Sequence, residues 1–167
     1  MFDWIQLKSG EWLKGELISL YEDALEFDSD ELDKLNLDWE DVRQVRTGRV
    51  VQVRVQNREP LTGRLVIDGN SIQVQGDTAT EQLDRADLIS IAPGEPKERS
   101  YWSGNTTIGF NWRKGNSEQV EANTLASIRR RTVDSRIIFD YAGNYNITDG
   151  GVASNNQRVN ARVDWFI

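Results

Sequence analysis

The chain contains no cysteine and no histidine, and both absences exclude kinds of chemistry. Without cysteine there are no disulfides and no thiol nucleophile. Histidine is the commonest general base and the commonest metal ligand, so Ser-His-Asp triads and zinc sites are excluded as well. Carboxylate pairs such as Glu40 and Asp41 remain, but adjacent residues on a strand point to opposite faces. We therefore expect no enzymatic activity and no cofactor.

Long hydrophobic runs are also missing. No segment approaches the roughly 20 apolar residues that a membrane-spanning helix needs, and 28% of the residues are charged. A transmembrane β-strand needs only about 10 residues, of which every second one is apolar. The opening residues MFDW lack the basic start and apolar core of a signal peptide. The composition thus excludes a helical membrane protein and leaves an outer-membrane β-barrel open.

Charge divides the 167 residues into two parts. Residues 1–96 carry 10 Lys and Arg against 20 Asp and Glu, a net charge of −10, whereas residues 97–167 carry 10 against 7, a net charge of +3. This asymmetry predicts two parts that lie in different surroundings. The acidic part repels phosphate and shows no basic stripe with interleaved aromatic residues, so we expect no nucleic-acid partner.

The acidic part contains an internal repeat. The segment IQLKSGEWLKGEL (5–17) aligns with VRVQNREPLTGRL (53–65). Each repeat reads as about five short strands with turn signals every eight to twelve residues, which is typical of a small antiparallel barrel. A glycine in the second strand of each repeat predicts a bend there. The aligned pairs are Ile5 and Val53, Leu7 and Val55, Leu13 and Leu61, Gly15 and Gly63, Leu17 and Leu65, Leu25 and Ile72, Phe27 and Val74, Leu37 and Leu83, Val42 and Leu88, and Val45 and Ile91.

These patterns predict an all-β chain. Residues 1–47 and 48–92 are expected to form two tandem small barrels of the SH3-like or Sm-like type. Residues 93–100 are the expected linker, because the segment APGEPKERS (92–100) holds two of the three prolines. Residues 101–167 are expected to form four long antiparallel strands, the start of a larger β-barrel.

The four expected long strands alternate between apolar and polar side chains, with Leu125 and Ile138 as the exceptions. The apolar positions are Trp102, Thr106, Ile108, Phe110 and Trp112, then Val120, Ala122, Thr124, Ala126 and Ile128, then Ile137, Phe139, Tyr141 and Tyr145, and finally Val159, Ala161, Val163, Trp165 and Ile167. In a soluble sheet the apolar side would face a protein core and the polar side water. In an outer-membrane barrel the apolar side would face lipid and the polar side a wet lumen.

Three details favour the outer-membrane barrel. Runs of 10 to 13 residues exceed the usual soluble strand of about five or six residues. The aromatic residues Trp102, Trp112, Tyr145 and Trp165 lie near strand ends, where an interfacial girdle would place them. The expected connections are KGNS (114–117), TVDS (132–135) and a long ITDGGVASNN (147–156). Placing 132–135 in the periplasm puts the longest connection outside and leaves the acidic part in the periplasm.

The sequence also resembles a known family. The segments DWIQLKSGEWLKGEL (3–17), WEDV (39–42) and YWSGNTTIGFNWRKGNSE (101–118) are similar to those of the bacterial salt-induced outer-membrane proteins, a family of unknown function. The resemblance covers essentially the whole chain. It implies an exported protein with an outer-membrane β-barrel at its C-terminal end, a link to salt or osmotic stress, and no established catalytic residues.

One departure from this family concerns length, because its members continue beyond four long strands. A single-chain bacterial barrel needs at least eight strands. We therefore expect either that the sequence is a fragment or that several copies share one barrel as a homo-oligomer.

Candidate sites are few. The segment DSDELD places Asp28, Asp30, Glu31 and Asp33 in one loop, which suits calcium but equally suits a solvated acidic hairpin tip. The segment RRR (129–131) could meet lipid headgroups or end a strand in solvent. The candidates for lining a lumen are Arg113, Arg136, Asp140, Arg158, Arg162 and Asp164, although these side chains could simply pair across strands.

The function that we expect from the sequence is that of a non-enzymatic bacterial envelope protein. Its β-barrel would contact outer-membrane lipid, with the N-terminal β domains in the periplasm. The alternative is a soluble all-β interaction module whose C-terminal sheet packs on the tandem barrels through its apolar face.

Overall fold

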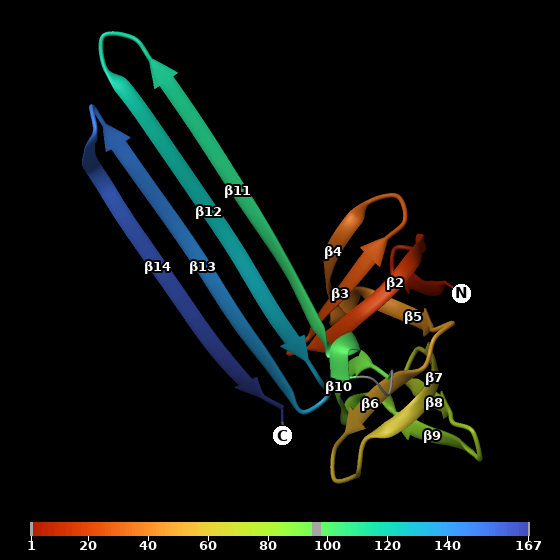
Figure 1. Cartoon of the computed structure of the whole chain (residues 1–167). Helices are drawn as coiled ribbons and strands as arrows, with labels where there is room; N and C mark the ends of the chain where they lie inside the picture. The colour runs from red at the N-terminus through yellow and green to blue at the C-terminus, as the bar shows by residue number, and fades with distance from the viewer. Residues whose placement is uncertain (1, 95–97, 167) are drawn as a thin grey trace. The chain divides into compact units, whose positions relative to one another are not determined.

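The computed structural model describes residues 2–94 and 98–166 and is all-β, as expected (Figure 1). The chain forms two compact units. The barrel unit comprises residues 2–94, 98–101, 131–135 and 165–166, and the sheet unit comprises residues 102–130 and 136–164. The expected linker falls partly on residues 95–97, which lie outside the described residues.

The two repeats each form five strands. The first has β1 (Asp3–Leu7), β2 (Trp12–Tyr21), β3 (Ala24–Ser29), β4 (Asp33–Asp38) and β5 (Val42–Arg46), and the second has β6 (Val51–Val55), β7 (Leu61–Asp68), β8 (Ser71–Gln75), β9 (Thr80–Asp84) and β10 (Leu88–Pro93). Short 3-10 helices, η1 (Trp39–Asp41), η2 (Arg85–Asp87) and η3 (Glu98–Tyr101), precede β5, β10 and the long strands. Hairpins join β2 to β3 at residues 21–24 and β7 to β8 at residues 68–71.

One closed barrel of six strands is built from both repeats. Its order is β1-β5-β7-β6-β10-β2, and β2 pairs with β1 to close it. Each repeat contributes three strands, and the hairpins β3–β4 and β8–β9 extend β2 and β7. The repeats were expected to form two tandem small barrels, whereas in the structure they share a single closed barrel. A repeat of about 45 residues is near the lower limit for a domain that buries its own core, and here β5 pairs with β7 and β10 pairs with β2 across the repeats.

Many of the aligned apolar pairs contribute to the core of this barrel. Ile5, Val45, Leu65 and Ile91, for example, are fully buried. The two aligned glycines allow close backbone approach, since a Cβ on Gly15 would lie 2.0 Å from the carbonyl oxygen of Asp28 and a Cβ on Gly63 2.5 Å from that of Gln75. The repeat and its glycines are therefore explained by packing.

A buried carboxylate connects three segments of the barrel. Asp3 is fully buried and accepts hydrogen bonds from the backbone N–H of Leu17 and of Gly48, each at 2.8 Å. The guanidinium of Arg49 lies 3.3 Å from the same carboxylate and also pairs with Glu16 at 2.6 Å. Burial alone would lower the pKa of Arg49, but hydrogen bonds and charge from Glu16 and Asp3 raise it above its ordinary value.

The barrel unit also includes the turn that follows β12, because the sequence supplies partners for it on β2 and β10. The hydroxyl of Tyr21 donates to the carbonyl of Thr132 at 2.7 Å, and the hydroxyl of Ser90 donates to the carbonyl of Val133 at 2.6 Å. Phe166 stacks on Tyr21 with ring centroids 4.4 Å apart. These contacts bury Val133 and Phe166 within the barrel unit.

The sheet unit confirms the four long antiparallel strands. They are β11 (Trp102–Lys114), β12 (Glu118–Arg131), β13 (Ser135–Thr148) and β14 (Gly151–Trp165), in the order β11-β12-β13-β14 (Figure 1). The expected long connection at 147–156 is wrong, because only Asp149 and Gly150 separate β13 from β14. Both residues have positive φ, of 49° and 79°, which is the backbone of a tight hairpin turn.

Candidate functional site

The long sheet has two faces of opposite character, and the register of β11 with β12 establishes them. Ile108 lies opposite Thr124, and Phe110 lies opposite Ala122. Residues directly opposite one another share a face, so the even positions of both strands form one side. The odd positions form the other side, where Asn105 lies opposite Ser127.

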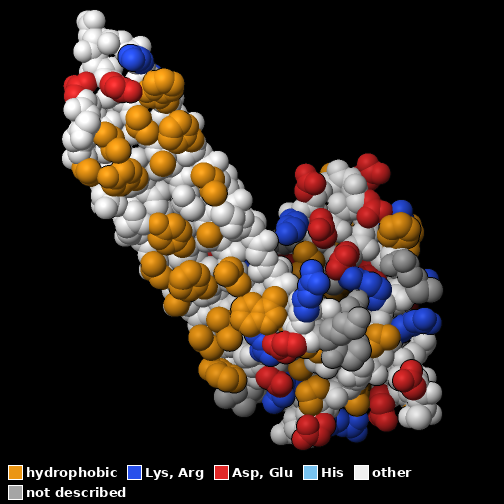
Figure 2. Space-filling model, in the orientation of Figure 1, with side chains coloured by type: hydrophobic (Ala, Val, Ile, Leu, Met, Phe, Trp, Pro, Cys, Tyr) orange, Lys and Arg blue, Asp and Glu red, His pale blue; other side chains and the backbone are white. Residues whose placement is uncertain are grey.

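Large apolar side chains cover the first side and are exposed. Ile108 is 74% exposed and Phe110 is 71% exposed. On β14, Val159 and Trp165 are 61% and 72% exposed. Figure 2 shows hydrophobic side chains spread along the long sheet on the visible face. Soluble monomers rarely expose a continuous apolar surface of this kind, which marks a contact with protein or with membrane.

The four aromatic residues that the sequence suggested for a membrane interface lie near strand ends. Trp102 begins β11 and Trp165 ends β14, whereas Trp112 and Tyr145 lie near the opposite ends of β11 and β13. Trp102 and Trp112 are ten residues apart on one strand, which corresponds to about 34 Å at 3.4 Å per residue. A strand tilt of about 40° reduces this length to about 25 Å, the height of the apolar band of outer-membrane barrels.

The second side carries a hydrogen-bonded polar network. Ser127 donates to Asp140 at 2.8 Å. Asn144 donates to Asn123 at 2.6 Å and to Glu121 at 3.3 Å. These bonds join β12 to β13 on the side that the alternation predicts to be polar.

The predicted lumen residues occupy this second side in two groups. Asp164 accepts hydrogen bonds from Arg136 at 2.9 Å and from Arg162 at 2.6 Å. Asp140 and Arg158 line a hollow of about 210 Å³ together with Asn105 and Ser127. Arg113 lies apart from both groups, opposite Gln119 near the hairpin that joins β11 and β12. The structure therefore brings five of the six candidates into clusters.

Leu125 is an exception to the alternation and lies within the polar side. It is opposite Thr107 and is 56% exposed, and it lines the same hollow as Asp140. The polar side is therefore mixed at this point, and its hollow has one apolar wall.

The calcium candidates are not brought together as a site. Asp30 forms an ion pair with Lys14 at 2.9 Å, and Asp33 has a positive φ of 56° at the start of β4. Within the described part of the chain, no three acidic side chains cluster closely enough to hold a metal ion. Asp28 and Glu31 thus belong to the hairpin β3–β4 and its acidic tip.

The three consecutive arginines behave differently from one another. Arg131 is buried and pairs with Glu26 at 2.6 Å, so neither the headgroup nor the solvated interpretation holds for it. Arg129 is exposed. No sequence pattern indicates the Glu26 contact, because 105 residues separate the partners.

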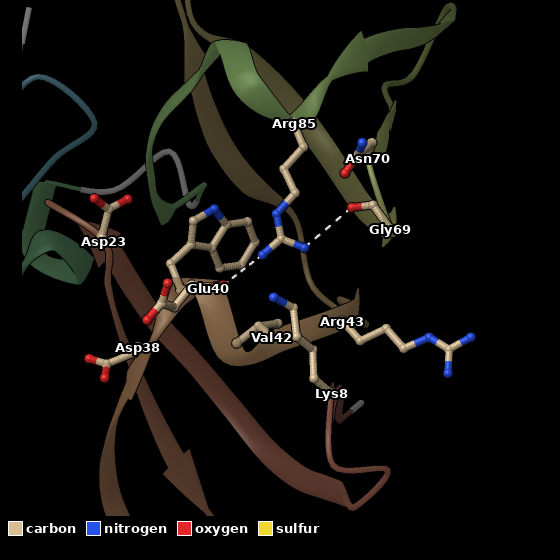
Figure 3. A pocket seen from close by; sticks show the side chains of 10 residues that line it. Lys8, Asp23, Asp38, Glu40, Val42, Arg43, Gly69, Asn70 and Arg85 are labelled. Carbon is tan, nitrogen blue, oxygen red and sulfur yellow. Dashed lines mark hydrogen bonds between the residues drawn. The ribbon is translucent and has the colours of Figure 1, made fainter.

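The barrel unit has a pocket that the sequence did not predict. Its volume is about 630 Å³, and Figure 3 shows its lining. Arg85 stacks on the ring of Trp39 at 3.8 Å and donates to the carbonyls of Trp39 and Gly69 at 2.7 and 3.3 Å. The lining residues are Lys8, Asp23, Asp38, Trp39, Glu40, Val42, Arg43, Gly69, Asn70 and Arg85.

This pocket lies where the two repeats meet. Trp39 and Arg85 occupy equivalent positions in η1 and η2, because the N–H of Trp39 donates to Asp23 and that of Arg85 donates to Asn70. Burial lowers the pKa of Arg85. Its guanidinium is engaged with backbone carbonyls, so it fastens one repeat to the other. The sequence feature that could have indicated this pocket is the alignment of Trp39 with Arg85 between the two repeats.

No helix in the described part of the chain is long and apolar enough to cross a membrane. Comparisons with protein-family models, with curated proteins and with solved structures found no match.

Proposed function

We propose that the chain is a non-enzymatic outer-membrane protein of bacteria whose long sheet forms part of a lipid-embedded β-barrel. The observation that carries the proposal is the exposed apolar side of the sheet, with Ile108 and Phe110 at its centre. In water this surface would be a strong aggregation site. In lipid it is the surface that a transmembrane barrel presents.

The dimensions of the sheet support the same proposal. Its strands have 13 to 15 residues, which is enough to cross a bilayer at a tilt of about 45°. The aromatic residues at both strand ends would then lie in the two headgroup regions. The polar network around Asp140 would face the interior of the barrel, where water and paired charges are tolerated.

We assign the barrel unit to the periplasm. The chain enters the sheet from this unit at Trp102, and both the turn 131–135 and the end of β14 belong to the unit. All these strand termini lie at the same end of the antiparallel sheet, so they would reach the same membrane surface. The connections at the other end of the strands are residues 115–117 and 149–150, which would then lie outside although the outer loops of such barrels are usually the longer ones. A link to salt stress and an SH3-like character of the repeats are further parts of the proposal and rest on resemblance.

A matched pair of substitutions tests the proposal. Ile108 is the central residue of β11 on the apolar side, and Thr107 is its neighbour on the polar side. In lipid, Ile108→Arg should destabilise the inserted chain by about 2–4 kcal/mol, because a charge at the midplane of a barrel costs that much on the lipid face. Thr107→Arg should be almost neutral.

The measurement is the urea midpoint of the full chain in phospholipid vesicles, with flotation to score membrane association. Equal effects of the two arginines would contradict the proposal. A full chain that is monodisperse in water without detergent and does not float would favour the soluble interaction module instead.

A further inference from the structure

The pocket around Trp39 and Arg85 is the feature from which we infer a ligand. Its volume of about 630 Å³ lies within the range of about 300–1,000 Å³ that is usual for small-molecule sites. Backbone hydrogen bonds hold its wall, from the N–H of Trp39 to Asp23 at 2.7 Å and from the N–H of Arg85 to Asn70 at 2.9 Å. Elements of both repeats therefore keep the lining in place.

Six charged side chains line this pocket, and charges of the same sign lie together (Figure 3). The acidic side carries Asp23, Asp38 and Glu40, and the basic side carries Lys8, Arg43 and Arg85. Among the residues that the structure describes, none of these six side chains forms an ion pair. Three charges of each sign are thus available to a molecule in the pocket.

This balance of charge selects the class of ligand. A simple anion would be repelled by the three carboxylates, and a simple cation would be repelled by the three basic groups. A molecule with a negative group at one end and a positive group at the other meets opposite charge at both ends. Complementary charges of this kind favour the matching partner and reject the others.

Arg85 is the group best suited to hold a carboxylate. A guanidinium has five N–H donors, and Arg85 uses two of them for the carbonyls of Trp39 and Gly69. Burial lowers the pKa of Arg85, so a carboxylate beside it would restore stabilisation of its charge. Pairs of guanidinium and carboxylate are also strong and often bidentate. Lys8 supplies a second cation, and its backbone N–H donates to the carbonyl of Asp41 at 2.8 Å.

We propose that the pocket binds a short zwitterionic peptide, with its C-terminal carboxylate at Arg85 and Lys8 and its N-terminal ammonium at Asp38 and Glu40. A single amino acid carries both charges on one Cα, whereas the two sides of this pocket do not reach each other to form ion pairs. A chain of two to four residues separates its end charges and can span the pocket. The site lies within the barrel unit, so the inference goes beyond the proposed membrane function and does not depend on it.

Alanine peptides of two, three and four residues test the site, because they carry only the two end charges and the backbone between them. The full chain, in detergent micelles or in water as its solubility requires, is labelled with 5-fluorotryptophan and titrated by fluorine NMR. Of its six tryptophans, Trp39 lines the pocket. The other five are exposed, so their substitution by phenylalanine assigns the Trp39 signal by elimination. They are Trp4, Trp12, Trp102, Trp112 and Trp165.

We expect at least one of the three peptides to shift the Trp39 signal saturably, with a Kd below about 1 mM. Acetylation of its N-terminus or amidation of its C-terminus should weaken binding about tenfold, because each cap removes a charge that the pocket pairs. No saturable shift with any of the three peptides would overturn the inference. Equal binding of capped and free peptides would overturn it as well.

Two substitutions assign the ends of the peptide. Lys8→Gln and Asp38→Asn each remove one exposed charge and should weaken binding of the free peptide about threefold to fivefold, the effect of a partly exposed ion pair. The effect of Lys8→Gln should vanish with the amidated peptide and that of Asp38→Asn with the acetylated peptide, because the paired charge is then absent. The matched controls are Lys34→Gln and Asp77→Asn, which are exposed and outside the pocket. Equal effects of pocket and control variants would overturn the site.

Discussion

Asp3 shows how a single buried residue fixes the barrel. Its carboxylate receives two backbone N–H groups, from Leu17 and Gly48, and the guanidinium of Arg49. The aligned position in the second repeat is Val51, which is also buried but apolar. The repeat pattern therefore predicts burial at this position but not the carboxylate, whose donors come from segments that are distant in the sequence.

Removal of this carboxylate should destabilise the chain. Asp3→Ala leaves the N–H groups of Leu17 and Gly48 unsatisfied in the interior, and each such group costs about 1–3 kcal/mol. We expect a loss of about 2–4 kcal/mol in the free energy of unfolding, measured by urea titration of the full chain with tryptophan fluorescence. The matched control is Asp77→Ala in an exposed turn, which should change stability by less than about 0.5 kcal/mol. Equal effects of the two variants would contradict this role of Asp3.

Other residue contacts show the same limit of sequence reasoning. Gly15 and Gly63 were predicted as bends from the repeat, whereas the structure shows that the carbonyls of Asp28 and Gln75 leave no room for a Cβ at these positions. The burial of Arg131 was not predicted, because its partner Glu26 lies on a strand of the first repeat. The local sequence pattern predicts which apolar residues and glycines are needed for packing. It does not predict long-range ion pairs, because these depend on the tertiary structure.

At the scale of elements, the turn between β13 and β14 is shorter than expected. The sequence ITDGGVASNN contains many loop-forming residues, which suggested a long loop. Asp-Gly is also a strong signal for a two-residue hairpin turn, and here this signal prevails. The side chain of Asp149 accepts a hydrogen bond from the N–H of Glu118 at 2.8 Å, which links the turn to the start of β12. The loop-length argument for topology therefore no longer applies, while the strand lengths and the two-faced pattern remain.

Two glycines at turns allow a matched test of this hairpin. Gly150 has φ of +79°, whereas Gly115 has no positive φ, and neither has a neighbouring atom within 4 Å of an added Cβ. Gly150→Ala should destabilise the hairpin by about 1 kcal/mol, because a side chain disfavours the left-handed backbone. Gly115→Ala should be neutral. The readout is the urea midpoint of the folded chain, and equal midpoints for the two variants would count against the tight turn.

The turn 131–135 receives hydrogen bonds from side chains of the barrel strands β2 and β10. Tyr21 and Ser90 are paired across β2 and β10 and both donate to this turn. At the equivalent pairing of β5 with β7, Gln44 and Asp68 bond to each other instead. The two repeats have therefore diverged at this pair of positions, so that one pair offers two hydroxyl donors to the turn and the other pair does not.

Substitution of these donors should release the turn. Tyr21→Phe keeps the ring stack with Phe166 but removes the bond to Thr132, so we expect a loss of about 1 kcal/mol. Combined with Ser90→Ala, the loss should rise to about 2 kcal/mol, with faster hydrogen exchange at Thr132 and Ser135. Tyr145→Phe, near the other end of β13, is the control and should leave this exchange unchanged. Unchanged exchange in the double variant would show that other contacts hold the turn.

At the scale of the whole molecule, the sequence predicted the all-β class, the repeat and the four long strands. It did not predict that the repeats share one barrel, because strand pairing between repeats leaves no local pattern. It also did not predict the pocket around Trp39 and Arg85, which forms only where the repeats meet. The charge asymmetry supports the proposal that the acidic part remains in water while the two-faced sheet lies in lipid.

The central claim is that alternate residues of β11 face lipid, and depth-dependent quenching tests it most directly. Single cysteines are introduced at each position from 107 to 111 in the full chain, which has no other cysteine, and a fluorophore is attached in vesicles. The account predicts strong quenching by nitroxide lipids at positions 108 and 110, and quenching by aqueous iodide at 107, 109 and 111. Iodide quenching at all five positions, with no effect of nitroxide lipids, would contradict it.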